Sequence, residues 1–460
     1  MKLDRIMIAA PKSGSGKTTI TCALLQALKD SGQSVVSYKC GPDYIDPMFH
    51  QKVIDIPSKN LDTFFTGEKE TKALFLKDRR SDEIAVLEGV MGLYDGLGGI
   101  RPEGSSYHLA RITKTPIVLV IDAKGMGRSV IPVIAGFLNY DHAHLIKGVI
   151  LNRMSGSYYE MIKPVIEDEL HICVAGYFTE HKEFHIESRH LGLIMPGEIK
   201  EVKAQLQKAA EELQKTVSME QILKIADEAE ELEEENRDSI WQTTQQVKRK
   251  PVIAVAKDEA FCFYYEDNLR LLQEYGAELK YFSPIHDKRL PEGCNGILIG
   301  GGYPELYGER LSNNTDMRIK IKSAIQDGMP VVAECGGFMY LHSVIRDKEG
   351  HRYPMAGVIP QECYDTGKLV RFGYIELVDK RGAFIPEGET IKGHEFHYYD
   401  SADNGDSCIA MKPVTGRTYP SVIAGENYFI GFPHLYYPSN PVFAEKFVEK
   451  ARKYQERKEQ

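Results

Sequence analysis

The chain has 460 residues, and its 57 Lys and Arg against 66 Asp and Glu give a formal net charge of -9 at pH 7. This balance excludes the basic footprint that nucleic acid or an anionic membrane surface requires. Since no apolar run reaches the roughly 18 residues of a membrane span and the N-terminus leads directly into a strand, we expect a cytoplasmic protein. The length predicts two or three domains, and the eight cysteines contain no Cys-x-x-Cys pair that would indicate zinc or a disulfide framework.

The first predicted elements are an apolar strand at residues 6–10, a glycine-rich turn and a helix that ends near Gly32. In such a turn, glycines let backbone N–H groups approach phosphate oxygens, a lysine adds positive charge and a hydroxyl reaches a metal ion. The turn resembles the loop of P-loop synthetases, because Pro11 stands where the standard motif has its first glycine. Lys12 is either a second phosphate contact or a solvated loop lysine. The predicted ATP-binding residues of the loop are Lys12, Gly14, Ser15, Gly16, Lys17, Thr18 and Thr19.

Carboxylates follow two predicted strands of this first part. Asp43 and Asp46 come after the strand at 35–38, where α/β sheets bind ligands, and are candidates for magnesium or substrate; an ordinary Asx turn explains the same pattern. Glu88 ends the strand at 84–87, which is the usual place for a second Mg²⁺ anchor beside a phosphate loop. The predicted metal ligands are Thr18, Asp43 and Glu88, and the predicted contacts to the reacting group are Asp46 and Asp95.

Further strands are predicted at 117–121 and 149–151, and their alternation with helical segments indicates a parallel sheet covered on both faces. Asn152 ends the second of these strands and is a candidate for pairing with an adenine edge, although a turn-forming asparagine is the commoner explanation. Arg189 lies in a Ser-Arg-His-Leu-Gly-Leu cluster and is a candidate contact to an anion. Glu, Lys, Gln and Ala dominate residues 198–250, which predicts one or two exposed helices and a linker.

A second α/β unit is predicted to begin at Pro251. Its apolar segment at 330–333 runs into Glu-Cys-Gly-Gly, the pattern of a nucleophile elbow, in which a strained turn exposes a reactive side chain at the edge of a sheet. Because a helix N-terminus favours the thiolate, we expect a lowered pKa for Cys335 and predict that its sulfur attacks a carbonyl group. A buried structural cysteine is the alternative.

A cysteine nucleophile needs a base, and its oxyanion needs hydrogen-bond donors. His434, in a Gly-Phe-Pro-His-Leu-Tyr-Tyr-Pro segment near the C-terminus, is the predicted base, with His394 and His397 as rivals. Backbone N–H groups donate to the oxyanion in sites of this kind. The predicted donors are Gly301, Gly302 and Gly336.

Together these motifs resemble the cobyrinic acid a,c-diamide synthases, a CobB/CobQ-type family of glutamine amidotransferases. The resemblance covers nearly the whole chain, and its most specific parts are residues 41–47, 88–96, 188–193 and 334–337 together with His434. It implies a dethiobiotin-synthetase-like P-loop domain with a parallel sheet and a class I glutamine amidotransferase domain with a flavodoxin-like fold. The implied boundaries are 1–197 for the P-loop domain, 198–250 for a helical charged linker, 251–447 for the amidotransferase domain and 448–460 for a charged tail.

The resemblance also implies the chemistry. Cys335 and His434 hydrolyse L-glutamine, and the ammonia passes internally to the P-loop domain. There ATP, with Mg²⁺, phosphorylates the a- and c-acetate carboxylates of a corrinoid, and ammonia displaces phosphate to leave amides. Tyr436 stands where class I triads have a glutamate, so the resemblance implies a Cys–His dyad. A homodimer is compatible with the resemblance. The residues implied at the substrate or acyl phosphate are Asp46, Asp95 and Arg189.

Two alternatives stay open. The same machinery fits hydrogenobyrinate or a nickel sirohydrochlorin as the acceptor, because pocket shape and not a motif separates these tetrapyrroles. A nucleotide-switched P-loop ATPase that amidates nothing is the second alternative, and it leaves the Cys335 elbow unexplained. The order of the two amidations, the ammonia path and the residues that contact the corrin ring are not encoded in motifs.

Overall fold

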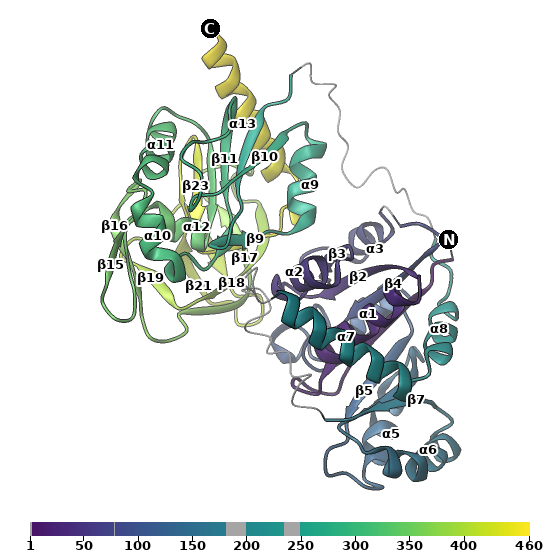
Figure 1. The fold of residues 1–460 in the computed structure, drawn as a ribbon. Helices are drawn as coiled ribbons and strands as arrows, with labels where there is room; N and C mark the ends of the chain where they lie inside the picture. Colours follow the sequence, from purple (N-terminus) through teal and green to yellow (C-terminus); the bar gives the residue numbers. More distant parts are fainter. Residues whose placement is uncertain (1, 78, 181–198, 234–248) are drawn as a thin grey trace. The chain divides into compact units, whose positions relative to one another are not determined.

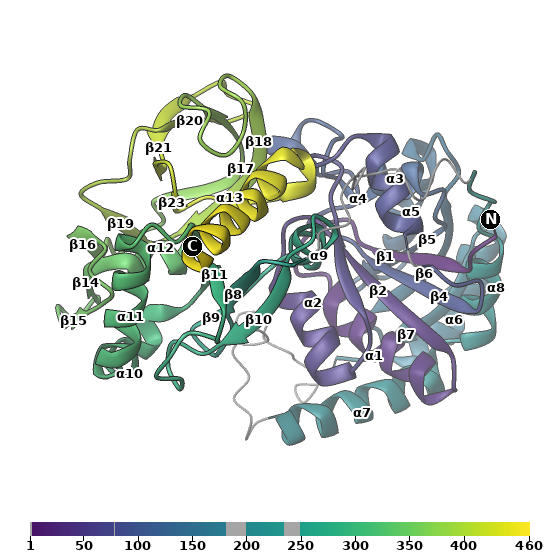
Figure 2. The same cartoon turned by 90° about the horizontal axis from the view of Figure 1, so that it is seen from above.

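The computed structural model describes residues 2–77, 79–180, 199–233 and 249–460. The chain divides into two compact units, Met1–Ile240 and Trp241–Gln460. Figure 1 shows the ribbon of both units, and Figure 2 shows the same ribbon from above. Among the described residues, no helix combines the length and the apolar character that crossing a membrane demands.

The first unit is organised around a seven-stranded sheet in the order β3-β2-β4-β1-β5-β6-β7. Every strand pair in it is parallel, and all five residues of the central strand β1 (Arg5–Ala9) are buried, as expected for a strand covered on both faces. Helices α1 and α7 lie on one face of the sheet and α4 and α5 on the other (Figure 2). The other strands are β2 (Ser34–Cys40), β3 (Ser58–Leu61), β4 (Glu83–Glu88), β5 (Ile117–Asp122), β6 (Ile146–Asn152) and β7 (Cys173–Phe178). The helices are α1 (Lys17–Asp30), α2 (Ile45–Phe49), η1 (His50–Ile54), α3 (Glu68–Leu76), η2 (Leu97–Gly99), α4 (Ser106–Ile112), α5 (Val130–Tyr140), α6 (Gly156–Leu170), α7 (Ile199–Thr216) and α8 (Met219–Asp227).

Helices α7 and α8 differ from the linker predicted for residues 198–250. Their apolar side chains belong to the core of the first unit, where they pack with α1 and with the sheet. Charged residues dominate the composition of α7, but four buried apolar residues recur along it at helical spacing. These residues are Leu206, Ala209, Ala210 and Leu213. A composition average hides such a stripe, and the structure therefore places this part of the predicted linker within the first unit.

The second unit contains a six-stranded sheet in the order β10-β8-β11-β13-β23-β22, in which every pair is parallel except β22 with β23. A five-stranded sheet (β21-β20-β17-β18-β24), a four-stranded sheet (β15-β14-β16-β19) and the pair β12-β9 complete it. The strands are β8 (Val252–Ala256), β9 (Phe261–Phe263), β10 (Glu278–Phe282), β11 (Cys294–Ile299), β12 (Gly301–Gly302), β13 (Val331–Glu334), β14 (His342–Arg346), β15 (Arg352–Pro354), β16 (Ile359–Asp365), β17 (Arg371–Asp379), β18 (Thr390–His397), β19 (Tyr399–Ser401), β20 (Cys408–Met411), β21 (Thr418–Ser421), β22 (Ile423–Ala424), β23 (Tyr428–Gly431) and β24 (His434–Leu435). The helices are α9 (Glu266–Glu274), η5 (Pro304–Tyr307), α10 (Gly308–Asn313), α11 (Thr315–Gln326), α12 (Gly336–Leu341), η6 (Tyr437–Ser439) and α13 (Val442–Glu459).

The two sheets confirm the predicted α/β class. The predicted charged tail at 448–460 differs from the structure, because most of it is the second half of α13. One side of this half is buried, at Val448, Ala451 and Tyr454, while its charged residues lie on the other side. The tail is therefore a structural part of the second unit.

Candidate active sites

The phosphate loop lies between β1 and α1, at the carboxyl edge of the parallel sheet. Gly14 and Gly16 adopt φ angles of 75° and 90°, which residues with a side chain rarely adopt. The Nζ of Lys17 donates to the carbonyl oxygen of Met91 at 2.6 Å. Burial, assisted by a second lysine nearby, lowers the pKa of Lys17 to about 8. The loop thus combines the glycine conformations and the inward-facing lysine that phosphate binding requires.

Two side chains from the end of β6 brace this loop. Asn152 donates from Nδ2 to the carbonyl oxygen of Ser15 at 2.8 Å, and its amide fills the space that a Cβ on Gly16 would take. Arg153 donates from Nη2 to the carbonyl oxygen of Gly14 at 3.2 Å. The adenine contact predicted for Asn152 stays a prediction, since in this structure its amide holds the loop backbone.

Behind the loop, two carboxylates converge on one buried ammonium group. The Nζ of Lys39, near the end of β2, lies 2.5 Å from Asp46 Oδ2 and 2.9 Å from Glu88 Oε1. Thr18 donates its hydroxyl to the same oxygen of Glu88 at 2.7 Å. Lys39 and Asp46 are each 4% exposed and Glu88 is 0% exposed. Residues of α1, β2, α2 and β4 therefore meet in one charged cluster that solvent does not reach.

Burial sets the electrostatics of this cluster. It raises the pKa of Glu88 to about 7, and the charge of Asp46 adds to the rise. Burial alone would raise the pKa of Asp46, but the adjacent Lys39 ammonium outweighs it and lowers that pKa. Burial alone would lower the pKa of Lys39, but Asp46 and Glu88 together raise it well above its usual value. One ammonium thus keeps Asp46 ionised and compensates Glu88 only in part.

The predicted ligands Thr18 and Glu88 fit a hard cation such as Mg²⁺. Glu88 Oε2 is buried and accepts no hydrogen bond from the residues that the structure describes. The Nε2 of His50 lies 3.6 Å from this oxygen, and burial lowers the pKa of His50 to about 4, so the ring is neutral. A carboxylate oxygen with spare acceptor capacity, close to a threonine hydroxyl, suits the oxygen-rich coordination that Mg²⁺ prefers.

Four other predicted residues of this site have no contact that tests their roles. Asp43 Oδ1 accepts the backbone N–H groups of the next turn, from residue 45 at 2.8 Å and residue 46 at 3.4 Å, which is an Asx turn at the start of α2. Asp95 Oδ2 accepts the N–H of Gly92 at 3.0 Å. Lys12 is exposed beside the loop, and Arg189 lies outside the described residues. The metal, substrate and phosphate roles of these four residues stay predictions.

In the second unit, Cys335 lies at a sharp turn between β13 and α12. Its backbone angles are φ 47° and ψ -104°, a conformation that costs a residue with a side chain about 1–3 kcal/mol. Its N–H donates to the carbonyl oxygen of Gly431 at 2.8 Å, and its own carbonyl oxygen accepts the N–H of Met339 at 2.9 Å. Hydrogen bonds on both sides therefore hold the strained turn that a nucleophile elbow requires.

Glycine backbones and the imidazole of His434 gather beside this elbow. A Cβ on Gly336 would lie 3.1 Å from the amide nitrogen of Gly302, and a Cβ on Gly301 would overlap the ring of His434. β24, which carries His434, comes shortly after β23, the strand that pairs with β13, so the imidazole and the Cys335 sulfur come from neighbouring strand ends. Only glycine permits these approaches. Gly301, Gly302, Gly336 and His434 therefore lie in one cluster next to Cys335, and their catalytic roles stay predictions.

The rival histidines lie in β18, which runs antiparallel to β24. His394 pairs with His434 in register, and their rings stack with centroids 4.9 Å apart and planes 15° apart. His397 is tied to the backbone of β19 by its Nδ1. Tyr436, at the position of the usual triad glutamate, donates its hydroxyl to Asp267 at 2.8 Å. His394 thus supports one face of the predicted base, while Tyr436 takes part in a different hydrogen bond.

Burial disfavours the charged forms of both the thiol and the imidazole. Burial raises the pKa of Cys335 well above its ordinary value, and the Glu305 carboxylate adds to the rise. The predicted lowering of this pKa is wrong here, because removal from water outweighs the dipole of a helix of only 6 residues. Burial, with a smaller effect of His397, lowers the pKa of His434 to about 3. Burial therefore opposes the formation of a thiolate–imidazolium pair in this structure.

Sequence reasoning missed two residues of the first site. Lys39 carries a signal that was available, because a lysine in a strand buried on both faces is rare unless a carboxylate pairs with it. His50 carries no such signal. It begins a π-helical turn, and tertiary packing brings its ring close to Glu88, in contact with Ser37 of β2 and Cys22 of α1.

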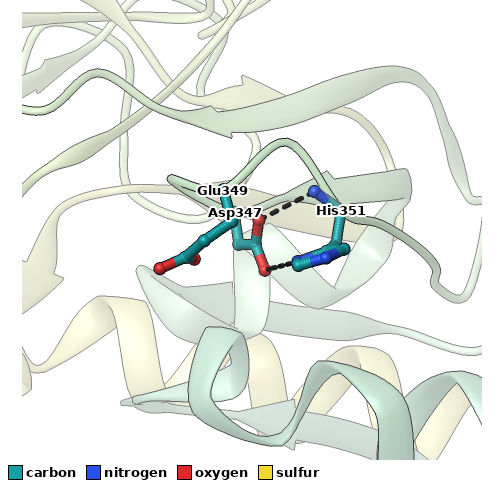
Figure 3. Close-up of side chains that lie close together, drawn as sticks. All are labelled: Asp347, Glu349 and His351. Atoms are coloured by element: carbon teal, nitrogen blue, oxygen red, sulfur yellow. Dashed lines mark hydrogen bonds and ion pairs between the residues drawn. The ribbon is translucent and has the colours of Figure 1, made fainter.

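A further group of metal-binding residue types lies in the hairpin between β14 and β15. The ligand atoms of Asp347, Glu349 and His351 lie within 4.8 Å of one another (Figure 3). Asp347 accepts the backbone N–H of His351 at 2.8 Å, and its other oxygen lies 3.0 Å from the Nδ1 of the same residue. These contacts are those of a hairpin turn. Because two of the three side chains are also exposed, we assign no metal to this group.

Comparison with known proteins assigns a type of domain to each unit. Residues 6–193 match the CobQ/CobB/MinD/ParA nucleotide binding domain, and residues 252–422 match the CobB/CobQ-like glutamine amidotransferase domain. A phosphate loop in one unit and a cysteine elbow in the other are the two parts of a glutamine-dependent ligase. That is the class of enzyme to which the fold and the matched domains assign this chain.

Relatives of this chain over nearly its full length bear the name cobyrinate a,c-diamide synthase. The relative from Caldanaerobacter subterraneus subsp. tengcongensis is 41% identical over 435 residues, which are 93% of this chain and 94% of the relative. The relative from Clostridium acetobutylicum is 41% identical over 451 residues, 96% of this chain and 99% of the relative. The relative from Thermoplasma volcanium is 38% identical and covers 100% of both chains. The chain belongs to the cobyrinate a,c-diamide synthase family, as the motifs predicted.

Proposed function

We propose that this chain uses ATP and glutamine to amidate cobyrinate, the acceptor in the name of its relatives, at the a- and c-acetate carboxylates. The observation that carries the proposal is the union, in one chain, of a strained cysteine elbow beside His434 and a phosphate loop with Lys17 and Thr18. The union makes chemical sense, because a free carboxylate resists attack by an amine whereas an acyl phosphate does not.

We assign glutamine hydrolysis to the second unit. His434 takes the thiol proton as the sulfur of Cys335 attacks the carboxamide carbon of glutamine, and it then gives a proton to the departing ammonia. The backbone N–H groups of Gly302 and Gly336 donate to the oxyanion, and the loss of one such donor typically costs ~10²–10³ in rate. Water then hydrolyses the thioester to glutamate and restores the thiol.

We assign activation of the acceptor to the first unit. Backbone N–H groups around Gly14 and Gly16, together with the ammonium of Lys17, hold the phosphates while an acceptor carboxylate attacks the γ-phosphorus and ADP leaves. Ammonia then attacks the acyl phosphate, phosphate leaves and an amide remains. Thr18 and Glu88 would hold Mg²⁺, which when bound neutralises charge on the phosphates.

The test is an incubation of the purified chain with ATP, Mg²⁺ and glutamine in the presence of cobyrinate, followed by mass spectrometry of the tetrapyrrole. We expect two successive losses of one mass unit, because each OH is replaced by NH₂. Hydrogenobyrinate and a nickel sirohydrochlorin are assayed in parallel, and a faster reaction with either would overturn the choice of acceptor. ATP-dependent dimerisation without glutamine turnover would overturn the proposal as a whole.

A further inference from the structure

In the first unit, a lysine ammonium contacts Glu88, one of the predicted ligands of a divalent cation. Lys39 Nζ lies 2.9 Å from Glu88 Oε1, the same oxygen to which Thr18 donates at 2.7 Å. The ammonium also lies 2.5 Å from Asp46 Oδ2 and 3.4 Å from the carbonyl oxygen of Gly89. The ammonium thus has oxygen neighbours of the kind that a metal ion prefers.

Because this cluster is buried, its carboxylates need a cation beside them whether or not a metal ion is bound. Asp46 and Glu88 are almost completely buried, and an ionised carboxylate removed from water is unstable unless an opposite charge or hydrogen bonds compensate it. Lys39 is the cation in direct contact with both carboxylates among the described residues. The Lys17 ammonium instead donates to the carbonyl oxygen of Met91, 2.6 Å away, and makes no ion pair in this part of the chain.

A divalent ion and the Lys39 ammonium cannot share Glu88 Oε1 without strong repulsion, because like charges a few ångströms apart in a buried site repel one another strongly. A metal ion that binds this oxygen must therefore displace the ammonium, and the ammonium then needs another anion. The phosphates of a nucleotide are such an anion. Thr18, which contacts the shared Glu88 oxygen, directly follows Lys17, the residue to which the proposed function assigns phosphate binding. A bound nucleotide thus offers the Lys39 ammonium another anion, and the two carboxylates then become free to bind a metal ion.

We propose that Lys39 is a resident counter-cation of the Asp46 and Glu88 carboxylates, and that it makes binding of a divalent cation depend on bound nucleotide. This inference rests on the proposed function, in which the first unit binds ATP with Mg²⁺. By linkage, the factor by which nucleotide strengthens metal binding equals the factor by which metal strengthens nucleotide binding, and such factors are typically about 5- to 150-fold. Lys39 is a source of this coupling.

The experiment measures Mn²⁺ binding by electron paramagnetic resonance, with and without a non-hydrolysable ATP analogue. We expect the wild-type chain to bind Mn²⁺ at least about tenfold more tightly with the analogue than without it. In Lys39→Met the two carboxylates lack their cation, so Mn²⁺ binding without nucleotide should become at least about tenfold tighter than in wild type and the coupling should shrink. Lys39→Arg keeps the charge and should keep the dependence on nucleotide.

Two control variants separate this role from a general loss of charge. Lys17→Met also removes one buried ammonium but leaves Lys39 in place, so Mn²⁺ binding without nucleotide should not tighten. The double variant Lys39→Met with Glu88→Gln should lose the gain, because the carboxylate that receives the ion is gone. Circular dichroism checks that each variant is folded.

Three results would overturn the inference. They are equal Mn²⁺ affinity of the wild-type chain with and without nucleotide, no gain in folded Lys39→Met, or an equal gain in Lys17→Met. If Lys39→Met does not fold, the inference is judged from the Mn²⁺ affinities of the wild-type chain and of Lys39→Arg, each measured with and without nucleotide. Failure of the proposed function has a different signature, because the Mn²⁺ results would then stand while cobyrinate is not amidated.

Discussion

Replacement of Gly301 by alanine tests whether the imidazole of His434 serves the thiol of Cys335. Gly301 has no direct chemical role beyond its N–H, yet it lies against the ring of His434. A methyl group at this position would therefore move the base without removing it. Because the first unit does not contain this contact, amidation with free ammonia should continue.

The magnitude follows from the contacts that the new methyl group would make. Its carbon would overlap Cε1 of His434 and would lie 3.2 Å from Nδ1 of that ring and 3.3 Å from a ring carbon of Phe263. Since unstrained carbon contacts lie at about 3.5–4.0 Å, the imidazole must move by about 1 Å. A misplacement of this size typically costs about 10²-fold in rate, so we expect a loss of about 10²-fold in glutaminase kcat/KM. Overpacking of a buried site should also destabilise the second unit by about 1–3 kcal/mol.

The assay compares glutamate release from glutamine with amidation supported by ammonium chloride. The matched control is Gly296→Ala in β11, where a Cβ would make only ordinary contacts, the nearest at 3.4 Å. We expect the control to keep glutaminase activity close to that of wild type. Full glutamine-dependent activity in Gly301→Ala would refute the assignment of His434, and loss of amidation with both nitrogen sources would show that the effect is not confined to the glutaminase site.

Three other predictions address separate parts of the chain. Cys335→Ala should abolish glutamine hydrolysis and keep amidation with ammonium chloride; loss of both activities would argue against two separate sites. Burial raises the pKa of Glu334 from 4.5 to about 8, so the stability that its protonated form contributes is fully present below about pH 4.5 and is lost as the pH rises towards 8. In thermal melts, the melting temperature of Glu334→Gln should therefore decline less over that range than that of wild type, and an unchanged pH profile would contradict the shift. Leu213→Ala in α7 should destabilise the first unit by about 2–5 kcal/mol in denaturant titrations, whereas a residue of a solvated linker would show almost no effect.

Motifs that are local in sequence were accessible to prediction. The phosphate loop and the Cys335 elbow each combine a strand, a turn and a helix start within a few residues, so their backbone conformations could be inferred from glycine positions and apolar runs. The family assignment followed from these segments. By contrast, the charged composition of α7 concealed an apolar stripe, because a composition average does not report which side of a helix a residue faces.

The electrostatics of the sites could not be predicted in the same way. The helix dipole suggested a lowered pKa for Cys335, but the dominant effect is burial by segments that are distant in sequence. Likewise, the sequence predicted a metal ligand at Glu88 and a contact to the reacting group at Asp46, whereas the structure pairs both with Lys39. Interactions of this kind depend on which side chains the sheet brings together, and no single segment contains them.

The backbone of Cys335 has a consequence for the evolution of this chain. At φ 47° and ψ -104° a glycine has no steric strain, so Cys335→Gly is expected to relieve the backbone strain while it removes the predicted nucleophile. Selection for a stable fold and selection for catalysis therefore act in opposite directions at this position. In a lineage that uses free ammonia as its nitrogen source, glycine should therefore replace cysteine at this position more often.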